Sequence, residues 1–189
     1  MKCAVVLFFV ALSSQAQEHC GSLMLAIDGG GRTGTKADAL AIGWKLPQPY
    51  RNVTIAVRLD SGGYDDYSIG SAYLMRQVGP GTTRYAEVSA SDFELPPAYE
   101  GELTLFHDLD LTPGEYWIVF ERPSYAKRGE PEWGVGKLQD LTVANGILFL
   151  GTKAYSYVNH RARYLPDASF MTTDGLQGYP LLIKGIPIF

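Results

Sequence analysis

Cysteine and histidine are scarce in this chain of 189 residues, which contains two cysteines and three histidines. Cys3 lies in the leader segment described below, so Cys20 is the one cysteine left to the mature chain, which excludes an intramolecular disulfide. His19, His107 and His160 stand at no spacing typical of a metal site. The sequence therefore does not favour a zinc hydrolase.

Charged residues are also few, and the two signs are mixed. The 16 Lys and Arg residues are outnumbered by 20 Asp and Glu residues, which gives a net charge of −4. No run of like charge is present, so the sequence offers no basic stripe for a phosphate backbone and no polybasic patch for a membrane surface. No apolar stretch beyond the leader is long enough to span a bilayer. We therefore expect no nucleic-acid partner and no membrane span.

Catalytic signatures are missing as well. There is no Gly-x-Ser-x-Gly motif, and the glycine-rich segment 28–36 differs from a nucleotide-binding loop because Thr35 stands where that loop has lysine. The spacing of the glutamates selects no pair for glycoside hydrolysis. The sequence favours a non-catalytic protein, so we assign no catalytic residue and no organic cofactor. A glycan-active hydrolase is kept as an alternative.

The first sixteen residues, in contrast, have the pattern of a secretory signal peptide. Lys2 supplies the positive start, Ala4 to Leu12 is an unbroken apolar run, and Ser14 and Ala16 place small residues where signal peptidase reads them. We predict cleavage before Gln17 and a secreted product, either extracellular or periplasmic. The mature chain is then divided into an N-terminal segment with a glycine-rich turn, 17–39, and a β-sandwich domain, 40–189.

Short apolar or alternating segments recur along the chain, divided by Gly, Pro, Asn and Asp, and they predict an all-β fold without helices. In Arg51 to Asp60 the apolar residues alternate with polar ones, which predicts a strand with one buried face. Glu102 to Leu111 repeats this alternation, with His107 on the inward face and Asp108 on the outward face. We expect His107 to be a hydrogen-bonded core residue. A turn at 112–114 predicts a hairpin with the strand Glu115 to Glu121.

The same reasoning places the other strands near 22–27, 40–46, 69–78, 83–89, 132–137, 140–150, 153–160 and 180–188. About ten strands are enough for two packed sheets, which hide edges that would otherwise aggregate. The predicted fold is a two-sheet sandwich, jelly-roll-like.

Two polar and aromatic segments, Ser61 to Tyr67 and Arg122 to Pro131, are long enough to be binding loops. Flat rings in or beside them can stack on the apolar face of a sugar, while charged side chains bond its hydroxyls. The candidate ligand-binding residues are Tyr64, Asp65, Asp66, Tyr67, Tyr125, Arg128 and Trp133. The adjacent carboxylates Asp65 and Asp66 are also candidate ligands of a structural calcium ion.

Three stretches carry a resemblance to a known group. They are Trp44 to Ile55, Ala72 to Thr83 and Leu111 to Trp117. In these stretches the chain resembles secreted bacterial β-sandwich domains found ahead of PEP-CTERM-type sorting tags. The resemblance implies the sandwich fold and export, and it implies no site residues. The chain differs from that group in lacking the sorting tag.

The sequence thus predicts a secreted, non-catalytic binding module, and extracellular polysaccharide or a surface protein is the expected partner. The aromatic content of 12% suits such a role, because rings serve both strand packing and sugar stacking. An alternative is a structural, self-assembling surface protein, in which Cys20 would join two subunits as a homo-oligomer.

Overall fold

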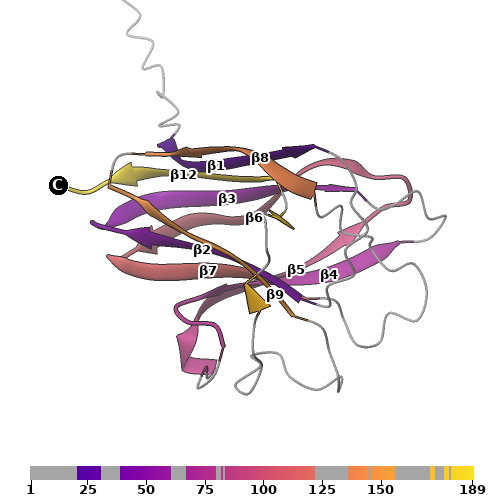
Figure 1. The fold of residues 1–189 in the computed structure, drawn as a ribbon, viewed down its shortest axis with the longest axis horizontal. Coiled ribbons are helices and arrows are strands. Elements are labelled where there is room, and N and C mark those ends of the chain that lie inside the picture. Colours follow the sequence, from indigo (N-terminus) through magenta and orange to yellow (C-terminus); the bar gives the residue numbers. More distant parts are fainter. Residues whose placement is uncertain are drawn as a thin grey trace, which may run out of the picture.

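The computed structural model describes residues 21–30, 39–60, 67–79, 82, 84–121, 136–144, 146–155, 171–172, 177–178 and 180–189. These residues form two antiparallel β-sheets that pack face to face (Figure 1). The predicted leader and Cys20 lie outside them. Within the described residues, no helix combines the length and the apolar content that crossing a bilayer requires.

Sheet A forms the upper layer in Figure 1. Its strands, in spatial order, are β11 (Gln177–Gly178), β8 (Gly136–Val143), β1 (Ser22–Gly30), β12 (Leu181–Pro187), β3 (Tyr50–Asp60) and β6 (Glu100–Leu111). Sheet B forms the lower layer. Its strands, in spatial order, are β10 (Met171–Thr172), β9 (Leu148–Tyr155), β2 (Ala39–Leu46), β7 (Gly114–Glu121), β4 (Ser68–Met75) and β5 (Glu87–Leu95).

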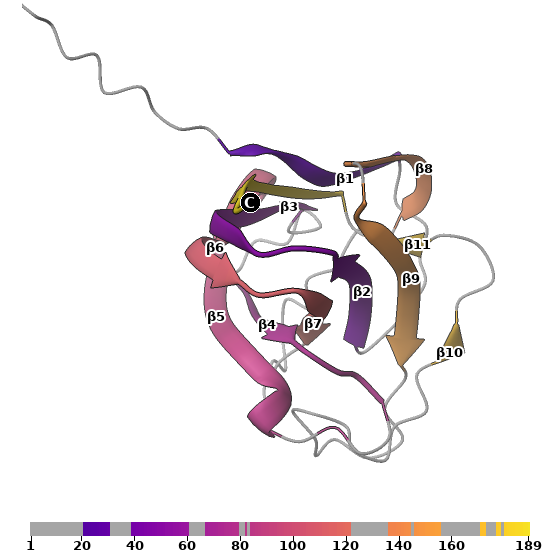
Figure 2. The same cartoon turned by 90° about the vertical axis from the view of Figure 1, so that its left-hand side faces the viewer.

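The two packed sheets confirm the predicted sandwich, and their strand order is that of a jelly roll. Successive strands cross from one sheet to the other except from β4 to β5, from β9 to β10 and from β11 to β12, and the first strand, β1, pairs with the last, β12. On one side, β8 and the short β11 extend sheet A, and β9 and the short β10 extend sheet B (Figure 2). Ser22–Gly30, which the sequence analysis placed ahead of the sandwich, is thus a central strand of sheet A.

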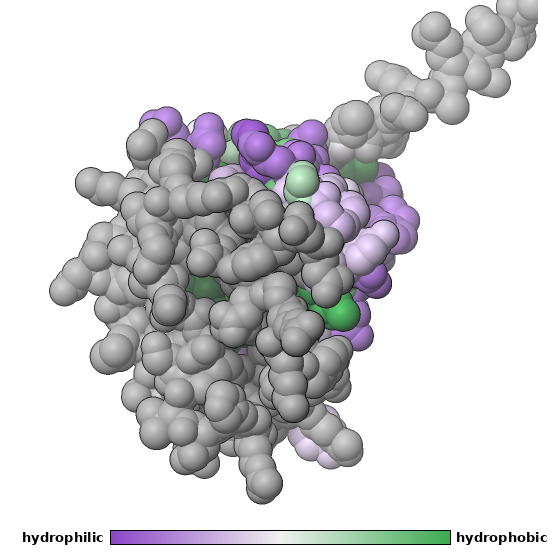
Figure 3. Space-filling view, turned by 90° about the vertical axis from the view of Figure 1, so that its right-hand side faces the viewer, coloured by the Kyte–Doolittle hydropathy of each residue, from purple (hydrophilic) through white to green (hydrophobic). Residues whose placement is uncertain are grey.

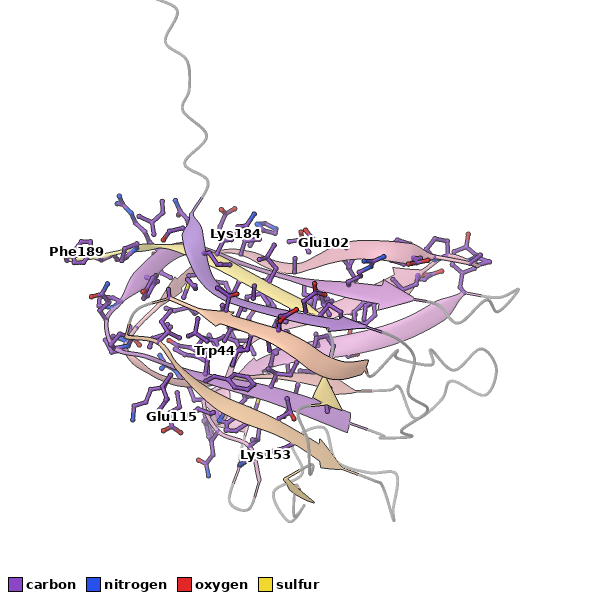
Figure 4. All side chains as sticks on the ribbon, turned by 45° about the horizontal axis from the view of Figure 1, so that its top comes forward. Trp44, Glu102, Glu115, Lys153, Lys184 and Phe189 are labelled. Carbon is purple, nitrogen blue, oxygen red and sulfur yellow. The ribbon has the colours of Figure 1, made fainter. Side chains whose placement is uncertain are left out.

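The core lies between the sheets and follows the predicted alternation. In β3 the inward residues Val53, Ile55, Val57 and Leu59 are all buried. Figure 4 shows Trp44 between the sheets, with charged side chains pointing away on the outer sides. Burial of each such apolar side chain contributes about 1.5–3 kcal/mol to the stability of the fold. One apolar layer therefore joins both sheets.

Several sequence expectations about strands are wrong in detail. The strand expected near 83–89 is a short 3-10 helix, η1 (Arg84–Ala86), followed by β5. The strand expected over 140–150 is interrupted, because β8 ends at Val143 and β9 begins at Leu148, with a turn closed by a hydrogen bond from Ile147 N to Ala144 O. Both segments are apolar enough to hide a turn from a reading of periodicity alone.

The predicted hairpin between the strands around 112–114 is also wrong. β6 pairs with β3 in sheet A, whereas β7 pairs with β2 and β4 in sheet B. The turn therefore carries the chain across the core. Gly114 has a φ of 132°, a backbone angle that residues with a side chain rarely adopt. Glycine at this position therefore lets the chain change sheets.

Arg76 fixes this crossing to the end of β4. Its guanidinium carbon lies 3.9 Å from the centroid of the Tyr116 ring, and it donates hydrogen bonds to the Thr112 hydroxyl and to Pro113 O. The Tyr116 hydroxyl donates to Thr112 O at 2.8 Å. Tyr116 in turn stacks on Trp44, with ring centroids 6.1 Å apart. A cation and two aromatic rings thus close this end of the core.

His107 is not a core residue, and the prediction that it points inward is wrong. β3 and β6 pair with three register shifts, and between the pairs Val53–Leu109 and Ile55–Phe106 the two residues His107 and Asp108 stand opposite a single residue. Asp108 has a φ of 54° at this bulge. His107 and Asp108 are therefore exposed on the same side, with Nδ1 and Oδ2 2.9 Å apart. Phe106 is buried instead.

A second, smaller apolar cluster lies on the outer face of sheet B. Ala41, Tyr73, Met75, Trp117 and Val119 are buried there, on strands β2, β4 and β7. The Trp117 ring lies over Gly43, where an added Cβ would come within 2.6 Å of ring atoms. A side chain at position 43 would therefore displace the ring.

We predict that Arg76→Met destabilises the protein by about 1–2 kcal/mol, because the variant loses the contact with Tyr116 and the bonds to the crossing turn. Urea denaturation followed by tryptophan fluorescence measures this change. The matched control is Lys184→Met, a lysine exposed on the outer side of sheet A (Figure 4). The control should stay within about 0.5 kcal/mol of the wild type. Equal losses in the two variants would contradict the role given to Arg76.

We also predict that Gly43→Ala costs about 1–3 kcal/mol, because the new methyl group overlaps a rigid ring. The same denaturation experiment measures it. In a Trp117→Leu background the cost of Gly43→Ala should fall clearly, since a smaller side chain leaves room for the methyl group. A cost that stays the same in both backgrounds would show that the ring is not the cause.

Candidate functional site

The two segments that the sequence predicts as binding loops join strand ends at the same end of the sandwich. Segment 61–67 runs from the end of β3 to the start of β4, and segment 122–131 follows the end of β7. Ser71, near the start of β4, pairs with Glu121 at the end of β7, and Asp60 pairs with Glu100 at the start of β6. The turn between Leu95, the last residue of β5, and Glu100, the first residue of β6, connects sheet B to sheet A at this end. The right-hand side of Figure 1 shows these strand ends together.

The opposite end of the sandwich holds three short turns, which carry the chain from β2 to β3, from β6 to β7 and from β8 to β9. The connection from β4 to β5, which contains η1, lies at this end as well. The jelly-roll crossings therefore separate the connections. The turns that Arg76 and Ile147 close lie at one end of the sandwich, and both predicted loops start from strand ends at the other. We call the end with the predicted loops, bounded by Asp60, Ser68, Leu95, Glu100 and Glu121, the loop end.

Of the seven predicted ligand-binding residues, the structure describes Tyr67. Its side chain is 52% exposed and lies directly ahead of β4, whose first residue, Ser68, pairs with Leu95. The other six, Tyr64, Asp65, Asp66, Tyr125, Arg128 and Trp133, lie outside the described residues. Tyr67 thus presents an accessible aromatic ring at the loop end.

A tight turn between β5 and β6 lies at the loop end, within the described residues. Tyr99 N donates to Pro96 O at 3.2 Å, and Ala98 at the third turn position has a φ of 56°. This is the conformation of a type II turn, in which glycine is the usual residue at that position. The Tyr99 hydroxyl then donates to Glu102 O at 3.0 Å, so the ring lies against Gly101.

Charged side chains lie next to this turn. Arg58 Nη2 lies 2.8 Å from Glu100 Oε1, and both side chains are largely exposed, so the pair contributes at most about 1 kcal/mol. Figure 3 looks onto the loop end and shows that the described residues along its upper rim, over sheet A, are mainly hydrophilic. Polar groups able to bond hydroxyls are therefore available at the same end of the sandwich as the exposed ring of Tyr67.

Trp117 and Tyr73 do not form a binding platform, although both are on an outer sheet face. Their side chains are buried, and Lys153 Nζ lies 4.4 Å from the Trp117 ring centroid. Figure 4 shows Lys153 on the same outer side of sheet B as Glu115. These two rings stabilise the sheet rather than face a ligand.

Tyr85 is the exposed ring that sequence reasoning missed. Its side chain is 83% exposed in η1, next to β5, whose first residue, Glu87, pairs with Met75 at the end of β4. It therefore lies at the end away from Tyr67. The Gly79-Pro80-Gly81 sequence shortly before it is a turn signal that favours a break from strand geometry here.

No group of three or more His, Cys, Asp or Glu side chains in the described part of the chain is arranged to hold a metal ion. The predicted calcium ligands Asp65 and Asp66 lie outside that part. The His107–Asp108 pair stands alone on the outer side of β6 and is highly exposed.

Comparison with known proteins found no match: no protein-family model, no curated protein and no solved structure is similar to this chain. The function must therefore be argued from the fold and the site themselves.

We predict that Ala98→Gly stabilises the protein by about 0.5–1 kcal/mol. Alanine pays for its left-handed backbone conformation at this turn, and glycine adopts that conformation without a Cβ clash. Thermal unfolding of the variant measures the gain as a raised melting temperature. A lowered melting temperature would contradict the assigned turn.

Proposed function

We propose that this chain is a secreted, non-catalytic β-sandwich module that binds extracellular polysaccharide at its loop end. The observation that carries the proposal is that both polar, aromatic segments join strand ends at one end of a jelly roll, where Tyr67 is exposed. A rigid two-sheet scaffold can hold such segments in place while their sequences determine which ligand binds.

Sugar binding follows from the residue types at this end. The ring of Tyr67, and with it Tyr64, Tyr125 and Trp133, would stack on the apolar faces of successive sugar units. Asp65, Asp66 and Arg128 would bond their hydroxyl groups, as Arg58 and Glu100 would at the rim. No proton transfer or nucleophile is needed, which suits a chain without a catalytic motif.

Export is the second part of the proposal, and it rests on the leader sequence and on the resemblance to exported bacterial β-sandwich domains. A secreted module would meet polysaccharides outside the cell or in the periplasm. Calcium bound by Asp65 and Asp66 would order one of the two segments without taking part in any reaction.

Polysaccharide binding can be tested with a glycan array followed by affinity electrophoresis on the polysaccharides it selects. We expect Tyr67→Ala to weaken binding about three- to tenfold, the effect of losing one stacked ring. The matched control is Tyr85→Ala, which removes a still more exposed tyrosine ring from the opposite end and should leave binding unchanged. Absence of binding on the array, or an equal loss in both variants, would contradict the proposal.

Cleavage of the leader can be tested independently by measuring the intact mass of the protein recovered from its native host. We expect a mature chain that begins at Gln17, because Ser14 and Ala16 occupy the positions that signal peptidase reads. A mass that includes residues 1–16 would contradict export by this route.

A further inference from the structure

β5 is the last strand of sheet B, and it is regular from Ser89 to Leu95, with one register shift at Val88 beyond this stretch. Seven consecutive residue pairs join it to β4, from Ser68–Leu95 to Leu74–Ser89, without a register shift. No described strand pairs with β5 on its other side. The neighbouring edge of sheet A is different, because β6 carries three register shifts against β3. Of these two edges, β5 therefore offers the straighter template for an added strand.

Charge on this side of the sandwich has one sign. The stretch from β5 through β6, residues 87–111, contains no lysine and no arginine. It contains seven acidic residues, which are Glu87, Asp92, Glu94, Glu100, Glu102, Asp108 and Asp110. Arg58 pairs with Glu100, His107 lies beside Asp108, and Asp92 accepts a hydrogen bond from the Ser71 hydroxyl of β4.

The outer face of β5 carries both this charge and apolar contact area. Asp92 and Glu94 are exposed on it, and Val88, on the same face nearer η1, is 40% exposed. Tyr85 is exposed just ahead of the strand. An incoming strand would thus meet two acidic side chains in the half of β5 nearer Leu95 and an apolar contact at the other end.

We propose that the outer edge of β5 is a docking site for an extended, cationic segment of a partner protein, which adds to sheet B as a further antiparallel or parallel strand. Backbone hydrogen bonds would supply affinity, and lysine or arginine side chains opposite Asp92 and Glu94 would supply selectivity. A second copy of this chain is disfavoured as the occupant, because two β5 edges would bring acidic strands together.

The test uses the mature protein and synthetic octapeptides with blocked ends. The probe alternates threonine and lysine, and the comparison peptides alternate threonine and glutamate or carry N-methyl groups along one edge of the threonine–lysine backbone. Isothermal titration calorimetry gives the affinities, and hydrogen exchange locates the protected amides. We expect the threonine–lysine peptide alone to bind, to protect residues 88–94 and to weaken as salt is added.

The variant is Asp92→Lys/Glu94→Lys, and the matched control is Glu115→Lys/Asp140→Lys, which makes the same change in net charge on exposed residues of β7 and β8. We expect the edge variant to weaken peptide binding about tenfold and the control to weaken it less than threefold. Equal weakening in the two variants, binding of the N-methylated peptide with unchanged affinity, or protection elsewhere would overturn the proposal. So would dimerisation of the unliganded protein through residues 88–94.

Discussion

A single apolar layer shared by two sheets is the constraint on which this molecule depends. The alternation in β3 places Val53, Ile55 and Val57 on one face, and that face can be buried only if a second sheet covers it. The proposed cleavage before Gln17 would leave Cys20 as the one cysteine, so a disulfide within the chain would not help. The jelly-roll crossings meet this constraint, because most connections pass from one sheet to the other and so tie the layers together.

The same crossings determine what the two ends of the sandwich can do. At one end, Arg76, Tyr116 and Trp44 stack and close the core beside the turn that carries the chain from β6 to β7. At the other end, the two predicted loops bring aromatic and charged residues to the strand ends. The outer sheet faces are not equivalent either, because sheet B buries Trp117 in a second apolar cluster while sheet A presents charged side chains. The two proposed binding sites accordingly lie at the loop end and at the edge of β5.

Much of the fold could be predicted from the sequence, because side-chain alternation is a local signal. The strand from residue 51 to 60 and the two-sheet sandwich follow from it. Where the prediction failed, a non-local effect was responsible. A bulge in β6 turned His107 outward, and no pattern in β6 alone shows that β3 has one residue fewer at that point. The turn at 112–114 was recognised, but whether it makes a hairpin or a crossing depends on which strands the sheets already contain.

The candidate site could be predicted less fully. Composition singled out two loops, and the described strand ends bring them to one end of the sandwich, which spacing in the sequence does not reveal. Tyr67 was found because it lies in a polar, glycine-rich segment. Tyr85 was missed because the apolar residues after it resemble the beginning of a strand. Conversely, Trp117 lies on an outer sheet face, and its burial depends on Gly43, a contact between strands far apart in the sequence.

The most direct test of the account is hydrogen–deuterium exchange of the mature protein, measured with and without the polysaccharide that the glycan array selects. The account predicts that added protection appears in peptides covering 61–67 and 122–133, which come from distant parts of the chain and meet only if the jelly-roll crossings bring them to one end. Protection confined to residues 76–86, at the end of the sandwich opposite the loop end, would contradict the account. Protection spread evenly over the sheet faces would contradict it as well.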